Sequence, residues 1–226
     1  MQELISTYFP NLVEKLPDFY ESILQTFEMV VRSGIVSMLL GIIFGIILVV
    51  TRKGGILENN IVFQITDKVI NVFRAIPFII LLTLVMPLSR SIMGTAIGVD
   101  GAIVPLIFGT VPFFSRQIES ALSEVSPGLI EAAESMGNSK LEIILNVYFK
   151  ESIPQIARAV SITIISLIGL TAMAGAVGAG GLGDFAIRYG HDRNETDITI
   201  ATVIVLVILV SIVQLIGNLV AKKNTH

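Results

Sequence analysis

Long uncharged apolar stretches alternate with short polar segments along the chain. Residues 33–51, 159–183 and 198–221 contain no Asp, Glu, Lys or Arg and consist mainly of apolar side chains. A helix needs about 20 apolar residues to cross the ~30 Å hydrocarbon layer of a membrane. A soluble core does not easily use three such segments, so the pattern predicts an all-α, polytopic membrane protein built as a helical bundle.

We expect five membrane spans in this bundle. They cover residues 26–50, 69–88, a segment within 92–115, 153–177 and 198–220. Pro77 lies inside the second span. Pro105 and Pro112 predict that the third span bends or breaks, because proline removes a backbone hydrogen-bond donor. Gly41 and Gly45 form a small-xxx-small pattern that lets the first span approach another helix closely.

Composition and charge agree with a membrane chain. Charged residues make up 15% of the sequence, and the mean hydropathy is +0.83. The net charge of −3 and the lack of a basic run give no reason to expect a nucleic-acid partner. Since the chain has no cysteine, disulfides and Cys-based metal sites are excluded. The first 25 residues lack the basic start of a signal peptide, so we expect the first span to insert uncleaved.

The basic residues that flank the spans indicate the orientation of the chain. With the N-terminus outside, eight Lys and Arg residues fall on the cytoplasmic side and four on the outer side. We therefore expect an N-out, C-in chain. Its parts are an extracytoplasmic segment 1–25, a transmembrane domain 26–220 with a cytoplasmic loop 116–152, and a cytoplasmic tail 221–226.

The loop at 116–152 has the pattern of two short helices. Ser126 and Pro127 predict the start of the first, because serine caps free N–H groups and proline suits the first helical position. Gly137 predicts its end, since glycine adopts the left-handed conformation at no steric cost. The residues that share its apolar face by helical spacing are Leu129, Ala132, Ala133 and Met136.

The second helix of the loop is predicted to start directly after the glycine. Ser139 and Glu142 have the spacing of a capping box. The expected apolar stripe of this helix consists of Leu141, Ile144, Leu145 and Tyr148. Two helices joined at a glycine corner make a rigid protrusion, and the small alanines of the first helix allow another backbone to come near.

The sequence EAAESMG at 131–137 resembles the EAA-xxx-G pattern of permease subunits in binding-protein-dependent ABC importers. Three further segments, FRAIPFIILL (73–82), AIVPL (102–106) and AMAGAVGAGGLG (172–183), look like the methionine-importer permeases of that family in order and spacing. The chain departs from the family pattern at Lys150, which stands where the family has proline. The resemblance implies the transmembrane domain of a type I ABC importer in the bacterial cytoplasmic membrane.

The resemblance also implies a role for the first loop helix and a set of partners. The helix would couple the spans to a separate ATPase subunit, through Glu131, Ala132, Ala133, Met136 and Gly137. The partners would be a second copy of the chain, two ATPase copies, an extracytoplasmic methionine-binding protein, and D- or L-methionine as cargo. ATP and magnesium would belong to the ATPase, because the chain lacks the G-x-x-x-x-G-K-[ST] phosphate-binding loop. We expect no catalytic residue, cofactor site or metal site in the chain itself.

The end of the fourth span offers candidates for the transport pathway. Met173 is flexible and apolar, so it could close a passage for an apolar amino acid, or it could simply pack in the core. Gly175 and Gly178 could let the span turn tightly, or let two copies of the chain meet around the pathway. Residues 178–183 satisfy G-x-G-x-x-G, but that dinucleotide motif requires a preceding strand, and an apolar span precedes it here.

Two alternatives to a methionine permease remain at this stage. The same ABC machinery could import another amino acid or small solute. A self-contained secondary transporter or channel would need internal repeats or ionisable residues near the membrane midplane. We find neither in the sequence, since Arg74 and Arg158 lie close to the expected span ends, so this second alternative is the weaker one.

Overall fold

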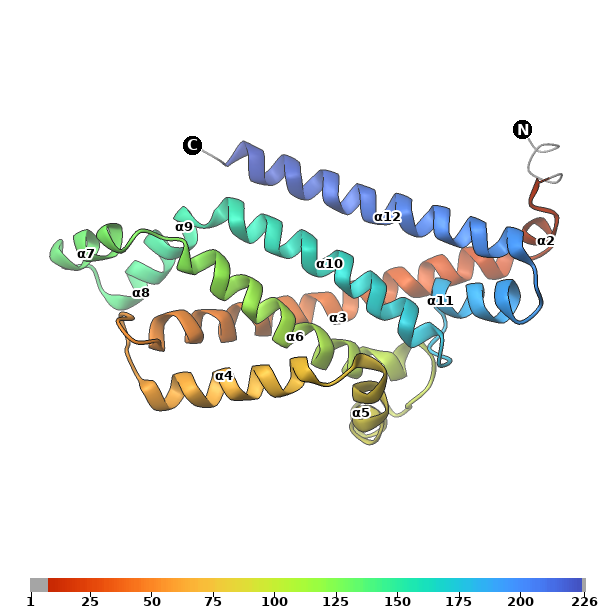
Figure 1. The fold of residues 1–226 in the computed structure, drawn as a ribbon, viewed down its shortest axis with the longest axis horizontal. Helices are drawn as coiled ribbons and strands as arrows, with labels where there is room; N and C mark the ends of the chain where they lie inside the picture. The colour runs from red at the N-terminus through yellow and green to blue at the C-terminus, as the bar shows by residue number, and fades with distance from the viewer. Residues whose placement is uncertain (1–7, 225–226) are drawn as a thin grey trace. The chain divides into compact units, whose positions relative to one another are not determined.

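The computed structural model describes residues 8–224, and every regular element in that range is a helix (Figure 1). The elements are α2 (Pro10–Glu14), α3 (Leu16–Thr51), α4 (Asn60–Ala75), α5 (Phe78–Met93), α6 (Gly98–Ser123), α7 (Pro127–Ser135), α8 (Lys140–Ile143), the π-helix η1 (Ile144–Tyr148), α9 (Phe149–Glu151), α10 (Ile153–Gly175), α11 (Gly181–Phe185), the π-helix η2 (Ala186–His191) and α12 (Thr196–Lys223). The prediction of an all-α bundle is confirmed.

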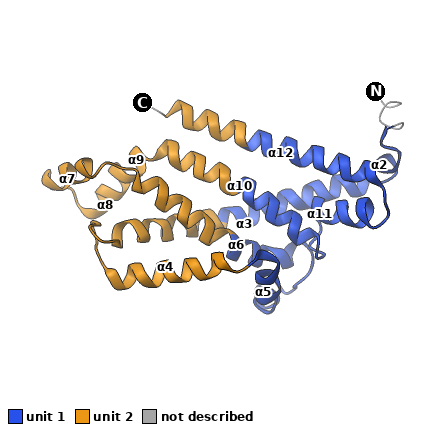
Figure 2. Ribbon diagram, in the orientation of Figure 1, with its two compact units in different colours: residues 1–35, 77–109, 164–213 blue, residues 36–76, 110–163, 214–226 orange. Residues whose placement is uncertain are grey.

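The chain forms two compact units, shown in different colours in Figure 2. Unit 1 comprises residues 1–35, 77–109 and 164–213, and unit 2 comprises residues 36–76, 110–163 and 214–226. The four helices α3, α6, α10 and α12 each contribute one part to unit 1 and the other part to unit 2. Within unit 2, the short helices α7, α8 and α9 lie together at one end (Figure 2).

Within the described residues, four helices are long and apolar enough to cross a membrane individually: α3, α6, α10 and α12. The predicted span 69–88 is instead divided between α4 and α5, which together qualify as one broken span or a re-entrant loop. The break lies at Ile76, whose φ of −81° and ψ of 122° are extended. Pro77 disfavours a helical conformation at the residue before it and cannot donate a backbone hydrogen bond.

The third predicted span differs in the opposite sense, because α6 is continuous through Pro105 and Pro112. Pro105 has no N–H to donate to the carbonyl of Gly101, four residues earlier. In unit 1 the buried Ser89 of α5 donates its hydroxyl to this carbonyl oxygen at 2.6 Å. A side chain from another helix thus satisfies the group that proline leaves free, and the helix does not break there. The first span is also longer than predicted, since α3 begins at Leu16.

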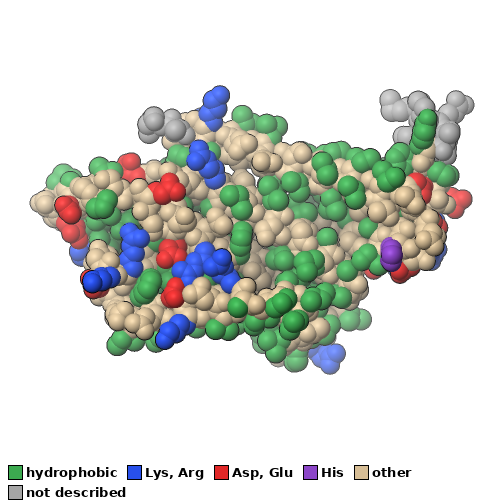
Figure 3. Space-filling view, viewed as in Figure 1, with side chains coloured by type: hydrophobic (Ala, Val, Ile, Leu, Met, Phe, Trp, Pro, Cys, Tyr) green, Lys and Arg blue, Asp and Glu red, His purple; other side chains and the backbone are tan. Residues whose placement is uncertain are grey.

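Each unit has its own apolar core. Unit 1 contains one cluster around Met29, Leu106 and Leu167 and a second around Phe19, Leu182 and Phe185. The cluster of unit 2 includes Phe114, Ile118, Ala133, Ile143 and Tyr148. Figure 3 shows many hydrophobic side chains on the outer surfaces of α12 and α5, as expected for helices that face lipid.

Close packing in unit 2 confirms the role expected of the small-xxx-small pair. A Cβ atom on Gly41 would lie 2.6 Å from Cδ1 of Phe114, and one on Gly45 would lie 2.6 Å from Cβ of Ile118. Real Cβ atoms do not approach other carbons this closely. The two glycines therefore let α3 contact α6 more closely than any other residue would permit.

Candidate coupling and translocation sites

The helix α7 begins and ends where the sequence predicts. Pro127 is its first residue and Ser126 its N-cap, although the Ser126 side chain makes no capping hydrogen bond, contrary to expectation. At the other end Gly137 has a φ of +82°. The N–H groups of Gly137 and Asn138 donate to the carbonyls of Glu134 and Ala133 at 2.9 and 3.1 Å. This left-handed closure satisfies two of the carbonyls that a helix end leaves free.

The four residues predicted to share one apolar face of α7 lie in two environments. Ala133 is 2% exposed and packs in the core of unit 2. Leu129, Ala132 and Met136 are exposed, Met136 at 74%, as is the neighbouring Glu131. The face that α7 presents outward therefore consists of Leu129, Ala132 and Met136, whereas Ala133 holds the helix onto its own unit.

The capping box of the second loop helix is present as predicted. Glu142 accepts hydrogen bonds from the N–H and the hydroxyl of Ser139, both at 2.7 Å, and its own N–H donates to the Ser139 hydroxyl. The hydrogen bond from the Ser139 side chain, followed by that from its backbone, lowers the pKa of Glu142. An ion pair between Lys140 and Glu134 links α8 back to α7. The corner between the two helices is thus fixed by polar contacts on both sides of Gly137.

The predicted apolar stripe of the second helix is wrong. Leu141 and Leu145 are more than half exposed, whereas Ile143 and Tyr148 are buried in the core of unit 2. The cause is the π-helix η1, in which the N–H of Phe149 bonds to the carbonyl of Ile144, five residues earlier. A wider turn shifts the inward face relative to a regular α-helix. Burial of the Tyr148 ring raises the pKa of its hydroxyl.

The family's proline position lies just after the π-helix. Lys150 is exposed there, in the short helix α9, and α10 begins three residues later with Pro154 in its first turn. The buried Ser152 between them donates its hydroxyl to the carbonyl of Ala121 in α6, at 3.1 Å. The start of α10 is therefore held to the last turn of α6.

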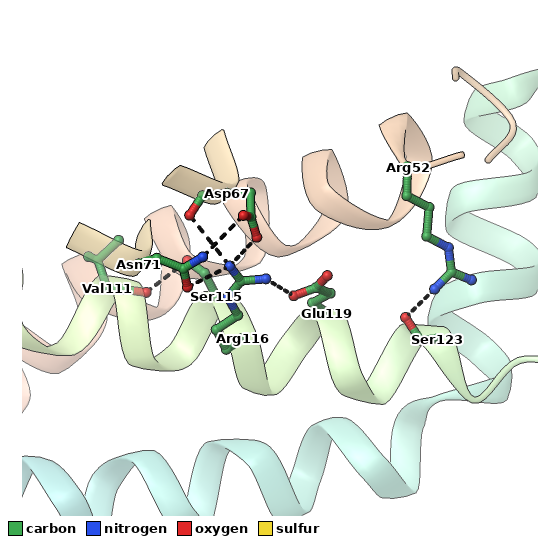
Figure 4. Close-up of polar contacts among 8 residues, drawn as sticks. All are labelled: Arg52, Asp67, Asn71, Val111, Ser115, Arg116, Glu119 and Ser123. Carbon is green, nitrogen blue, oxygen red and sulfur yellow. Dashed lines mark hydrogen bonds and ion pairs between the residues drawn. The ribbon is translucent and has the colours of Figure 1, made fainter. Parts of the chain in front are cut away.

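A polar cluster that the sequence analysis missed joins α4 to α6 in unit 2 (Figure 4). Arg116 of α6 forms ion pairs with Asp67 of α4 and with Glu119 of its own helix. It also donates to the side-chain oxygen of Asn71 at 2.9 Å. We had assigned Arg116 to the cytoplasmic loop and found no acidic residue deep in a span. The available signal was the helical spacing of two polar pairs, Asp67 with Asn71 and Arg116 with Glu119.

The glycine-rich segment forms the turn between α10 and α11 in unit 1. Gly178, Gly180 and Gly181 all have φ values between +78° and +92°, so this path favours glycine at three positions. The N–H groups of Gly181 and Leu182 donate to Gln25 and Thr26 of α3, at 2.7 and 2.8 Å. Since a helix precedes the turn and these N–H groups are already bonded within the chain, the segment does not bind a dinucleotide through this motif.

The predicted pathway residues lie on α10 and in this turn. Met173 is 43% exposed and is not a member of the core clusters, so core packing does not account for it within the described chain. Gly175 is buried, and a Cβ there would lie 2.5 Å from the backbone nitrogen of Asp184. Gly178 is exposed. In residues 8–224 no three His, Cys, Asp or Glu side chains are grouped to hold a metal ion.

These features define a membrane-embedded transport subunit with a helical protrusion at the end of unit 2. The family model described as "Binding-protein-dependent transport system inner membrane component" matches residues 37–226, and the chain belongs to this family.

Among its relatives, the probable D-methionine transport system permease protein MetI of Vibrio cholerae is 46% identical over 202 residues. That match covers 89% of this chain and 90% of the relative. The protein of the same description from Haemophilus influenzae is 40% identical and covers 92% of this chain and 95% of its own.

Solved structures give the same result. A structure of the inward-facing MetNI methionine ABC transporter matches with a TM-score of 0.92 and 38% identity, over 94% of this chain and 99% of that one. An amino acid ABC transporter solved with histidines matches with a TM-score of 0.77 at 16% identity, which shows the common fold alone.

Proposed function

We propose that this chain is the membrane-spanning permease of an ATP-driven methionine importer. The observation that carries the proposal is its similarity over nearly the whole length to the MetNI structure and to relatives named as D-methionine permeases. The chain serves as a transport subunit and not as an enzyme, so a partner ATPase binds ATP and magnesium. A second copy of the chain, two ATPase copies and an extracytoplasmic methionine-binding protein complete the assembly.

In this proposal α7 is the coupling helix. Its outward apolar face of Leu129, Ala132 and Met136 docks against the ATPase, with Glu131 beside it, and Ala133 anchors the helix from behind. Gly137 fixes the end of the helix and hence its direction. When the ATPase subunits bind ATP, they displace the coupling helices of the two permease copies, and the spans follow.

The orientation follows from this assignment. A helix that docks on an ATPase lies in the cytoplasm, so the loop containing α7 to α9 is cytoplasmic and the N-terminus is outside. The segment 1–25 then begins outside a bacterial cytoplasmic membrane, residues 26–220 form the transmembrane domain, and residues 221–226 form an inner tail. The basic end of α12, Lys222 and Lys223, agrees with a cytoplasmic C-terminus.

We assign the translocation pathway to the end of α10. The half-exposed thioether of Met173 provides a flexible apolar plug for an apolar cargo. Gly175 lets α11 return closely along α10, and Gly178 opens the turn between them. Together they place a movable side chain beside a backbone that is fixed in position.

The test is the uptake of labelled methionine in cells that lack their own methionine transporters. The cells carry the chain with its ATPase and binding protein, either unsubstituted or with Ala132→Trp. Ala133→Trp is unsuitable, because Ala133 is buried and a large side chain there would disrupt the core. Ser135→Trp adds the same bulk at an exposed position outside the apolar face and serves as the control.

We expect uptake by the unsubstituted and Ser135→Trp chains, and loss of uptake with Ala132→Trp at normal membrane levels. Normal uptake by the Ala132→Trp chain would refute the coupling role of α7. If a well-expressed unsubstituted chain takes up no methionine, the cargo assignment is wrong, and other amino acids replace methionine in the same assay.

A further inference from the structure

The helix α4 is attached to unit 2 by little apolar burial. Among its residues, all of which the structure describes, Ile70 is the one that is buried. Its long apolar side chains point outward and are more than half exposed: Ile61, Ile65, Val69 and Val72. In a membrane such a face meets lipid, and apolar contact between helices gains little because lipid is equally apolar. The position of α4 therefore depends on its polar face.

That polar face contacts α6 through Arg116 (Figure 4). One terminal nitrogen of the guanidinium, Nη2, binds the Asp67 carboxylate and the Asn71 amide oxygen, and the other, Nη1, binds Glu119 at 2.7 Å. Asn71 also donates to Asp67 at 3.1 Å, which closes the network on the α4 side. Among the residues that the structure describes, Arg116–Asp67 is the ion pair that joins α4 to another helix.

The network is protected from water, so it is a firm connection. The Arg116 side chain is 19% exposed, and those of Glu119 and Asp67 are also largely covered. Removing one member of a covered ion pair leaves the other charge without compensation, which costs more than the loss of an exposed pair. A planar guanidinium that contacts both helices also fixes their relative rotation, which a lysine would not do.

The same end of α6 leads into the proposed coupling helix. Beyond Arg116, Ser123 accepts a hydrogen bond from Arg52 at the end of α3, at 2.7 Å, and the Ala121 carbonyl accepts one from Ser152. Pro127, the first residue of α7, follows Ser123 after three residues. The last turns of α6 are thus tied to its neighbours immediately before the chain enters α7.

We propose that Arg116 is a positioning residue that fastens α4 to α6, so that the two helices move as one body when α7 is displaced. This inference rests on the proposed coupling role of α7. Without the ion pair, α6 still follows α7, but α4 remains behind in the lipid. ATP hydrolysis then continues while transport is lost.

The experiment compares Asp67→Leu with Glu28→Gln in the complete complex of permease, ATPase and binding protein in proteoliposomes. Glu28 belongs to an exposed pair with Arg32 on α3 and serves as the control. We expect Asp67→Leu to lower methionine uptake by about tenfold or more, which corresponds to ~1.4 kcal/mol of lost coupling. ATP hydrolysis should continue at the unsubstituted rate, and Glu28→Gln should change neither quantity. Arg116→Lys, which keeps the charge but loses the planar contact, should give intermediate uptake.

A second measurement needs no cargo and separates this inference from the assignment of methionine. Because the chain has no cysteine, spin labels can be placed on Ile65→Cys in α4 and Ser120→Cys in α6, both exposed positions. We expect the distance between the labels to stay constant between the nucleotide-free and ATP-bound complexes, and to change when Asp67→Leu is added. A distance that changes with ATP in the chain with the ion pair intact would overturn the proposal. So would uptake at the control level by the Asp67→Leu chain, or a parallel loss of uptake and ATP hydrolysis.

Discussion

Substitution of Gly137 tests whether the shape of the turn after α7 depends on its left-handed backbone. A Cβ atom at Gly137 would have no neighbour within 4 Å, so an alanine meets no steric obstacle from the rest of the chain. The cost of Gly137→Ala is therefore that of holding an L-residue at a φ of +82°, about 1–2 kcal/mol. This free energy corresponds to a roughly five- to thirtyfold change in the opening equilibrium of the turn.

Hydrogen exchange measures this equilibrium directly. The N–H groups of residue 137 and of Asn138 close the turn by bonding to Glu134 and Ala133, and their exchange rates report how often it opens. We expect Gly137→Ala to raise both rates by about five- to thirtyfold. Gly137→Asn should raise them less, because asparagine tolerates the left-handed conformation. Methionine uptake by the complex should fall in the same order.

Gly128→Ala is the matched control on the same helix. Its Cβ would lie 3.7 Å from the Ser126 hydroxyl, an ordinary contact, and alanine in a helix is more stable than glycine by about 0.5–1 kcal/mol. We expect this variant to slow exchange at the end of α7, or to leave it unchanged, and to transport normally. If Gly137→Ala and Gly128→Ala gave the same exchange rates, the backbone argument for Gly137 would be refuted.

Two further predictions concern polar contacts. Ser89→Ala removes the donor to the buried Gly101 carbonyl and should destabilise the protein by about 1–3 kcal/mol in detergent melting, while adding Pro105→Ala should restore a backbone donor and recover much of the loss. Because its pKa is lowered, Glu142 stabilises the Ser139 cap at pH values above its unfolded pKa, and this contribution is lost as the pH falls through the folded pKa. Exchange of the Glu142 amide should therefore accelerate at acidic pH beyond its intrinsic trend, and the change should be absent in Glu142→Gln, which does not titrate.

Much of the coupling protrusion could be predicted from local sequence. Proline at the first position of α7, the left-handed Gly137, and the capping box of Ser139 and Glu142 all lie where expected. These features depend on backbone groups within a few residues of one another, so the local sequence is sufficient. The capping bond expected of Ser126 is absent, and the π-helix η1 displaces the predicted apolar stripe, because packing against the core of unit 2 determines which face turns inward.

The sequence by itself determined the class of protein, since uncharged stretches of membrane length have few other stable uses. It also determined the glycine turn after α10, where left-handed angles require residues without a side chain. The tertiary structure decided which prolines interrupt a helix, because the proline at 105 is compensated by Ser89 from another helix. It also decided that Arg116 meets Asp67 across 49 residues of sequence. Contacts of this kind depend on how helices pack, and a one-dimensional pattern of apolar and polar residues does not contain that information.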